Sequence, residues 1–123
     1  MNNIAQDRVD ALFHALADRT RRDILRRVLQ GEHSVSALAG SYSMSFAAVQ
    51  KHVAVLERAG LLTKRRRGRE ALARGEVDAV RSASALLYEL EGIWRGRTGR
   101  IEALFAHASG GATRPGTNHT TRP

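Results

Sequence analysis

The sequence predicts a mainly α-helical protein with one small β-hairpin. Two observations carry this prediction. Apolar residues recur every three or four positions over most of the chain, which is the spacing of amphipathic helices. The stretch 61–73, "LLTKRRRGREALA", departs from that spacing. Its opening residues favour extended structure and its glycine permits a turn, so two short strands joined at Gly68 are expected there.

The first two elements are helices. Apolar residues at helical spacing mark the first one: Ile4, Val9, Leu12, Phe13 and Leu16. The second begins after Asp18 or Thr20, because either side chain can cap a helix, and it ends before Gly31. This helix carries the apolar residues Ile24, Leu25, Val28 and Leu29.

A short helix, a tight turn and a longer helix follow. Ser34 or Ser36 caps the short helix, which carries Val35, Leu38 and Ala39 and ends at Gly40. Ser45 caps the longer helix, and Gly60 is placed to end it. One buried stripe of the longer helix is predicted to hold Phe46, Val49, Val53 and Leu56.

The last helix is predicted from about Glu76. Its apolar residues recur at spacings of three, four or seven: Val77, Val80, Leu87, Leu90, Trp94, Ile101, and Leu104 or Phe105. A long helix with one such stripe suggests a partner helix. Gly92, Gly96 and Gly99 each weaken a helix by about 1 kcal/mol relative to alanine, so its continuity near Gly96 to Gly99 is left open. We expect one domain over 1–107 and a flexible tail over 108–123.

Charge and composition limit the function. Twenty Lys and Arg against twelve Asp and Glu give a net charge of +8, which attracts polyanions such as nucleic acid or an acidic membrane surface. The chain has no cysteine, which excludes disulfides, thiolate metal sites and cysteine nucleophiles. It shows neither a signal-peptide pattern nor an apolar run of membrane-spanning length, so we expect a cytoplasmic protein.

The order of elements is that of a winged helix-turn-helix. In that fold the second helix of the pair enters the DNA major groove and the hairpin reaches an adjacent groove or the backbone. Opposite the apolar stripe of the longer helix lie Ala47, Ala48, Lys51, Ala54 and Arg58, flanked by Gln50 and His52. Gln50 can pair with adenine, Lys51 can contact guanine or a phosphate, and Ser45 with the first backbone amides can hold a phosphate.

Two basic clusters flank this helix. The hairpin carries Lys64, Arg65, Arg66, Arg67 and Arg69, for which we predict phosphate or minor-groove contacts rather than a merely solvated charge run. The second helix carries Arg19, Arg21, Arg22, Arg26 and Arg27, which we assign to its solvent-exposed side.

No motif for a metal, a cofactor or an enzyme is evident. The five histidines share no ligand spacing, and the chain has no glycine-rich phosphate loop, nucleophile elbow or convincing carboxylate pair. Aromatic residues make up 5% of the chain, too few for a platform that stacks single-stranded bases.

Three segments resemble the ArsR-type family of bacterial winged-helix repressors, and more narrowly its metal-independent, autorepressor-like branch. They are "FHALADRTRRDILRRVLQGEHSVSALA", "MSFAAVQKHVAVLERAGLL" and "KRRRGRE". The resemblance implies a homodimer, joined through the first and last helices, that represses transcription from a pseudo-palindromic operator and is nucleoid-associated when bound. It assigns DNA contacts to Ser45, Gln50, Lys51, His52, Arg66, Arg67 and Arg69. Residues expected at the dimer interface are Val9, Leu12, Leu87, Leu90, Trp94 and Ile101.

Some positions depart from the family pattern. Arg19 replaces the usual proline, Gln50 stands where serine is common, and "EALARG" replaces aromatic residues in the second strand of the hairpin. The cysteines or the Asp, His and Glu residues by which family sensors bind metals are missing, so any inducer is of another, unknown kind. A protein-interaction module or a non-specific architectural DNA binder remains the alternative.

Overall fold

The computed structural model describes the backbone of residues 3–109 and the side chains of residues 4–97. The chain forms two compact units, residues 1–86 and residues 87–123, and each is described by itself. The first unit is mainly helical with a small three-stranded sheet. This confirms the predicted winged helix-turn-helix class, with one strand more than the sequence analysis expected.

Two helices open the first unit, α1 (Asn3–Leu16) and α2 (Arg19–Gln30). The side chain of Asp18 accepts a hydrogen bond of 3.0 Å from the backbone N–H of Arg21. Asp18 rather than Thr20 is therefore the cap of α2. That hydrogen bond is also the main cause that lowers the pKa of Asp18, because it favours the charged carboxylate.

The helix-turn-helix consists of α3 (Val35–Ala39) and α4 (Phe46–Arg58). Ser34 caps α3 and Ser45 caps α4, each accepting from a backbone N–H at 3.0 Å. Gly60, with φ of 79°, follows α4 in the left-handed region. The N–H groups of Gly60 and Leu61 bond the carbonyls of Glu57 and Leu56, both at 2.9 Å, which satisfies the last turn of the helix. The predicted end of α4 is confirmed.

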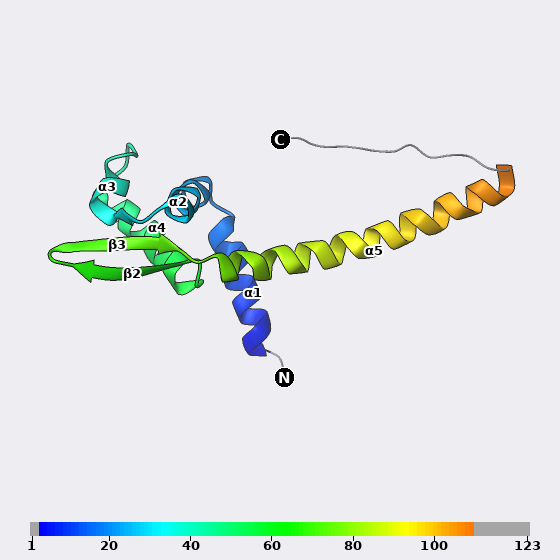
Figure 1. Ribbon diagram of the computed structural model, residues 1–123, viewed down its shortest axis with the longest axis horizontal. Coiled ribbons are helices and arrows are strands. Elements are labelled where there is room, and N and C mark those ends of the chain that lie inside the picture. The colour runs from blue at the N-terminus through cyan, green and yellow to red at the C-terminus, as the bar shows by residue number, and fades with distance from the viewer. Residues whose placement is uncertain (1–2, 110–123) are drawn as a thin grey trace. The chain divides into compact units, whose positions relative to one another are not determined.

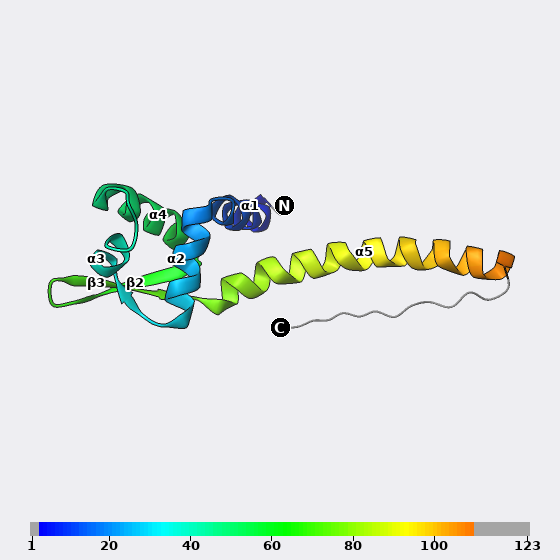
Figure 2. The ribbon, with the colours of Figure 1, turned by 90° about the horizontal axis from the view of Figure 1, so that it is seen from above.

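The sheet has the order β1-β3-β2 and is antiparallel throughout. Its strands are β1 (His33–Ser34), β2 (Leu62–Arg67) and β3 (Glu70–Gly75). Arg67 pairs with Glu70, so the hairpin turn is only two residues long, and Gly68 takes a φ of 63° there. Figures 1 and 2 show this hairpin projecting past α3 and α4. We call β2, β3 and their turn the wing.

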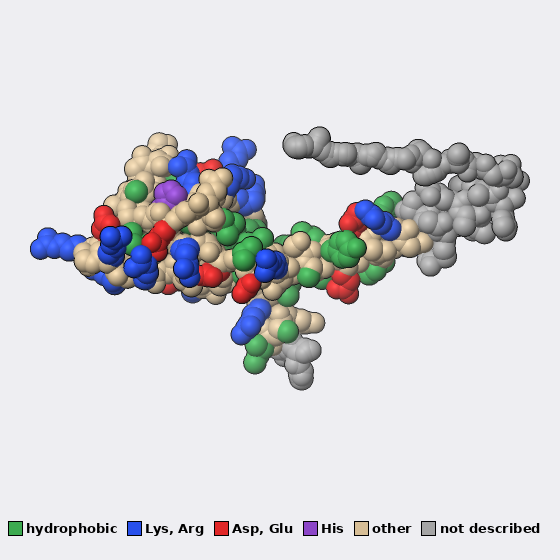
Figure 3. Space-filling view, in the orientation of Figure 1, with side chains coloured by type: hydrophobic (Ala, Val, Ile, Leu, Met, Phe, Trp, Pro, Cys, Tyr) green, Lys and Arg blue, Asp and Glu red, His purple; other side chains and the backbone are tan. Residues whose placement is uncertain are grey.

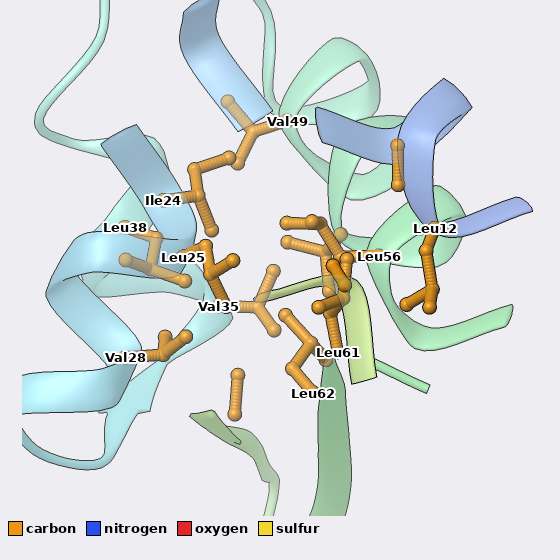
Figure 4. Packing of buried hydrophobic residues seen from close by; sticks show 14 residues of the cluster. Leu12, Ile24, Leu25, Val28, Val35, Leu38, Val49, Leu56, Leu61 and Leu62 are labelled. Carbon is orange, nitrogen blue, oxygen red and sulfur yellow. The ribbon is translucent and has the colours of Figure 1, made fainter. Parts of the chain in front are cut away.

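The core lies where the helices of the first unit meet the base of the wing. Figure 4 shows side chains from α1, α2, α3, α4 and the start of β2 pointing toward one another. The largest fully buried side chains are Ile24, Leu38, Leu56, Leu61, Leu62, Val28, Val49 and Val53. Because one core contains residues of both α4 and the wing base, the position of the wing relative to α4 is fixed by packing.

Gly75, at the end of β3, lets α2 approach the sheet closely. A Cβ built on Gly75 lies 2.6 Å from Cδ2 and 3.0 Å from Cα of Leu29. These distances leave no room for a larger residue without movement of α2 or β3. Leu29 itself is 41% exposed, whereas Ile24, Leu25 and Val28 of α2 are buried.

The last helix, α5 (Val77–Ser109), belongs to both units. In the first unit, Ala83 is buried and Ala79 and Val80 pack against the core. The backbone of α5 is helical through Gly92, Gly96 and Gly99, so the break left open by the sequence does not occur. The predicted tail, 108–123, begins inside α5, and residues 110–123 lie outside the described part of the chain. No helix among the described residues is long and apolar enough to cross a membrane.

Candidate nucleic-acid interface

The outward face of α4 carries three of the residues predicted to contact DNA. Ala47, Gln50 and Lys51 are exposed, while Val49 and Val53 on the opposite side are almost completely buried. The short side chain of Ala47 allows another backbone to come close, and the longer side chains of Gln50 and Lys51 extend outward. This face has the chemistry needed to enter a groove and form hydrogen bonds with base edges.

Phe46 does not lie in the buried stripe of α4, contrary to the prediction. Its side chain is 47% exposed. Phe46 is the first residue of the helix, where one flank is not covered by a preceding turn. It lines a surface groove together with Gln50, so this aromatic side chain belongs to the outward-facing site.

That groove lies between the helix-turn-helix and the wing and has a volume of about 210 Å³. The residues that line it come from α3, α4 and the wing: Val35, Ser36, Phe46, Gln50, Val53, Lys64, Arg66, Arg69, Glu70 and Ala71. Four residues predicted to contact DNA, namely Gln50, Lys64, Arg66 and Arg69, therefore meet in one hollow.

Side chains of β2 alternate between the two faces of the wing, as in any strand. Lys64 and Arg66 line the groove beside α4. Arg65 instead pairs with Glu32, with Nε and Nη2 each 2.9 Å from a carboxylate oxygen. Arg67 is two residues from Arg65, so it lies on the same face of β2 as Arg65, and it does not line the groove. The structure thus brings Arg66 and Arg69, but not Arg67, toward Gln50.

The first two cations of β2 are paired with carboxylates. Lys64 Nζ lies 3.4 Å from Glu57 Oε1 in α4, and Arg65 holds Glu32. The hydrogen bonds from Arg65 lower the pKa of Glu32. Among the described side chains, no ion pair involves the three cations toward the tip, Arg66, Arg67 and Arg69. Figure 3 shows Lys and Arg side chains along the visible face of the wing as far as its tip.

Three arginines of α2 contact other residues of the protein. Arg22 is exposed as predicted, whereas Arg21 and Arg27 are partly buried, contrary to the prediction. Arg21 donates to the carbonyls of His14 and Ala15 at the end of α1, and Arg22 donates to that of Leu16. These bonds add side-chain donors to carbonyls in the last turn of α1. Arg27 stacks over the ring of Tyr42, 5.4 Å from its centroid, and contacts Asp23 and Ser41. Arg19 and Arg26 are exposed as predicted.

Tyr42 anchors the turn between α3 and α4 to α2. Its hydroxyl donates to Asp23 Oδ2 at 2.6 Å. Burial of the phenol and this hydrogen bond raise the pKa of Tyr42 to about 12. Hydrogen bonds from Tyr42 and Arg27 lower the pKa of Asp23. The turn that precedes α4 is therefore held by a polar cluster that local sequence periodicity did not reveal.

His52 is less accessible than the other predicted contacts of α4. Its side chain is 22% exposed, and Nδ1 lies 3.3 Å from Nη1 of Arg21. The same nitrogen lies 3.9 Å from Asp18 Oδ2. His52 is thus held from α2 at one ring nitrogen.

Comparison with known proteins gives a consistent result. Residues 18–64 match the family described as "Bacterial regulatory protein, arsR family". The chain is 42% identical over 67 residues to the HTH-type transcriptional regulator YuzN of Bacillus subtilis, covering 49% of this chain and 73% of that protein. A crystal structure of an ArsR family transcriptional regulator matches with 31% identity and a TM-score of 0.69, covering 73% of this chain and 93% of that one.

The chain belongs to the ArsR family of bacterial regulatory proteins. It is a transcriptional regulator with a winged helix-turn-helix DNA-binding domain. An ArsR-like regulator from Rhodococcus sp. RHA1 has the same fold, with a TM-score of 0.70 and 27% identity over 81% of this chain and 94% of that one. A possible ArsR-family regulator from Mycobacterium bovis, described as homodimeric, matches with a TM-score of 0.60 and 26% identity over 74% of this chain and 87% of that fragment.

Two apolar surfaces of this ArsR-family chain bear on the predicted dimer. In the first unit, a groove of about 920 Å³ lies between α1, the end of α4 and the first turns of α5. Val9 and Leu12 both line this groove, but Val9 is half-buried, whereas Leu12 is 5% exposed and packs in the core of its own chain. Leu12 therefore has little area left for a second chain.

The second apolar surface lies on the part of α5 in the second unit. Leu87, Leu90 and Trp94 are 54%, 51% and 62% exposed. The side chain of Ile101, also predicted at the interface, lies outside the described residues. Within the part of the chain whose side chains are described, no group of three or more His, Asp or Glu residues could hold a metal ion.

Proposed function

We propose that this ArsR-family regulator is a homodimeric, sequence-specific repressor that binds a pseudo-palindromic operator in double-stranded DNA without a regulatory metal. The observation that carries the proposal is the groove in which Gln50 of α4 meets Lys64, Arg66 and Arg69 of the wing. A hydrogen-bonding side chain for base edges and cations for phosphates lie there side by side. Its place of action is the cytoplasm, where bacterial DNA lies.

Some residues at α4 contact the bases of the operator, and others contact its phosphate backbone. Gln50 pairs with an adenine edge, and Lys51 contacts a guanine edge or a phosphate. Ser45 and the first free N–H groups of α4 hold a phosphate at the positive end of the helix. Ala47 allows the helix to approach the floor of the groove.

The cations of the wing increase the affinity for DNA but do not distinguish between DNA sequences. Arg66 and Arg69 face α4 and contact the DNA backbone or the minor groove beside the recognition helix. Arg67, on the other face of β2, contacts a phosphate farther along the duplex. Lys64 and Arg65 are already paired with Glu57 and Glu32, so they contribute less to binding.

A homodimer is supported by the exposed apolar stripe of α5. Leu87, Leu90 and Trp94 follow one another at spacings of three and four residues, so they share one face of the helix. Covering this face with the same face of a second chain removes apolar area from water. Two chains related by a two-fold axis then place two recognition helices in successive major grooves, about one helical turn apart.

Independence from metal is supported by the absence of cysteine and of the ligand pattern that sensors of the family use on the last helix. Release from the operator then depends on another kind of inducer or on the amount of protein present.

The test is selection of bound duplexes from a random double-stranded library, followed by anisotropy titration of the selected duplex and a scrambled duplex at two salt concentrations. We expect an inverted repeat bound roughly a thousandfold more tightly than the scramble. The double variant Gln50→Ala, Lys51→Ala should bind both duplexes equally. Recovery of no motif, with strongly salt-dependent binding to every duplex, would instead identify a non-specific DNA binder. Full discrimination by the double variant would contradict the role of α4.

A further inference from the structure

The side chain of Arg21 joins three elements of the first unit. From α2, its Nε donates to the carbonyl of Ala15 at 2.8 Å, and Nη2 donates to that of His14 at 2.9 Å. Its remaining terminal nitrogen, Nη1, lies 3.3 Å from Nδ1 of His52 in α4. Two bonds to α1 thus fix the guanidinium, and its third nitrogen is presented to the recognition helix.

This contact decides which ring nitrogen of His52 carries the proton. A guanidinium has only donors and accepts no hydrogen bond. Nδ1 of His52 must therefore be the acceptor, and the proton of the neutral ring lies on Nε2. The competing partner, Asp18 Oδ2, is 3.9 Å from Nδ1, too far for a hydrogen bond, and it already accepts from the N–H of Arg21.

The orientation of the ring follows from the same contact. His52 is 22% exposed and lies about 100° around α4 from Lys51. With Nδ1 held by Arg21, the ring offers its surroundings a single polar group, the Nε2–H. An N–H donor suits an acceptor on DNA, either a phosphate oxygen or the N7 or O6 atom of guanine.

We propose that Arg21 is a positioning residue for DNA recognition, which holds His52 as a neutral Nε2–H donor toward a hydrogen-bond acceptor on the operator. The proposal rests on the proposed function, because it assumes that α4 enters the major groove. In this proposal Arg21 does not itself contact DNA. Its hydrogen bonds to the last turn of α1 hold it where it sets the tautomer of His52 in α4.

The first arm of the test needs no DNA. Long-range ¹H–¹⁵N correlation spectra of the full chain, labelled at histidine and recorded at about pH 8.5, where histidine side chains are ordinarily neutral, report the tautomer of each ring. His52 is assigned by its loss in His52→Gln. We expect only the Nε2–H form in the wild type and a mixture of both forms in Arg21→Lys, whose ammonium cannot span three acceptors.

Arg22→Lys is the matched control, because Arg22 also caps α1 but bonds only the carbonyl of Leu16. It should leave the spectrum of His52 unchanged. A wild-type ring in the Nδ1–H form, or an Arg21→Lys spectrum identical to the wild type, would overturn the proposal.

The second arm measures affinity for the selected operator. Glutamine places its amide nitrogen near the position of Nε2, whereas asparagine places it near that of Nδ1. His52→Gln should therefore bind within about twofold of the wild type, and His52→Asn and Arg21→Lys should each bind roughly three- to tenfold more weakly, as for one lost hydrogen bond. Equal binding by all three variants would contradict the proposal.

Chemical changes in the DNA identify the acceptor. Replacing single guanines by 7-deazaguanine tests the base edge, and replacing single phosphates by methylphosphonates tests the backbone. A DNA substitution that weakens binding by the wild type but not binding by His52→Asn identifies the atom that accepts the hydrogen bond from His52. If no such position exists, the DNA step of the proposal is wrong. If the wild type selects no duplex at all, the proposed function fails, and the spectra still decide the tautomer.

Discussion

Arg65 of β2 and Glu32 form an ion pair with two hydrogen bonds, Nε to Oε2 at 2.9 Å and Nη2 to Oε1 at 2.9 Å. Its neighbour Lys64 pairs on the opposite face of the strand with Glu57 of α4. Each of these cations therefore already has a carboxylate partner within the protein. The wing is held from both faces at its base, while the cations toward its tip are available to another anion.

This arrangement predicts different effects for two adjacent arginines. Arg66→Ala should weaken binding to all duplexes and reduce the slope of log affinity against log salt by about one unit, the expected effect of one lost phosphate contact. Arg65→Ala should leave the slope nearly unchanged, because the charge of Arg65 is already compensated by Glu32. Titrations at several salt concentrations check this. An equal decrease of this slope in both variants would show that the ion pair between Arg65 and Glu32 breaks when DNA binds.

The pair of Tyr42 and Asp23 predicts how stability depends on alkaline pH. The pKa of Tyr42 is raised from 10.0 to about 12, so folding favours the protonated phenol. Its contribution to stability is complete below pH 10 and falls as the pH rises toward 12, by at most about 1.4 kcal/mol per pH unit. Tyr42→Phe should remove this part of the pH dependence. Urea unfolding of both proteins at pH 9, 10 and 11 provides the comparison, and parallel curves would contradict the prediction.

Gly75 predicts a steric effect of a single methyl group. Gly75→Ala should lower the free energy of unfolding by about 1 to 3 kcal/mol, because the new Cβ would lie 3.0 Å from the backbone Cα of Leu29 as well as 2.6 Å from its Cδ2. Gly31→Ala is the matched control, since no atom lies within 4 Å of that Cβ and the backbone is extended, with φ of 172°. Chemical denaturation measures the free energy of unfolding of both variants, and equal values would contradict the prediction.

Features that depend on neighbouring residues in sequence could be predicted. Ser45 and Gly60 bound α4 through hydrogen bonds within three to five residues, and such signals are visible in any short window. Strand β1 is only two residues long, too short for a periodic pattern, and it exists because β3 pairs with it. The exposed Phe46 was mistaken for a core residue because helical spacing does not show where the covering elements end.

Contacts between distant segments could not be predicted. Glu32 and Arg65 are 33 residues apart, and Arg21 and His52 are 31 apart. Only the packing of α2, α4 and the wing around one core brings these side chains together. The sequence thus supports the prediction that α4 and the wing contact DNA, but it does not distinguish the cations held by carboxylates from those that are available.

The apolar stripe of α5 predicts how the chain associates. Trp94 is 62% exposed and shares a helix face with Leu90, so Trp94→Glu places a charge on the face that a second chain should cover. Tyr88→Glu is the control, because Tyr88 is 74% exposed but lies about 100° around the helix from Leu87. By light scattering, the wild type and Tyr88→Glu should have the mass of a dimer, twice the chain mass of 13.5 kDa. Trp94→Glu should have the mass of a single chain. Since uncoupled half-sites lose the effective concentration that linkage provides, Trp94→Glu should bind the operator at least roughly a hundredfold more weakly. A monomer that kept the affinity of the wild type would mean that one wing and one α4 suffice for recognition.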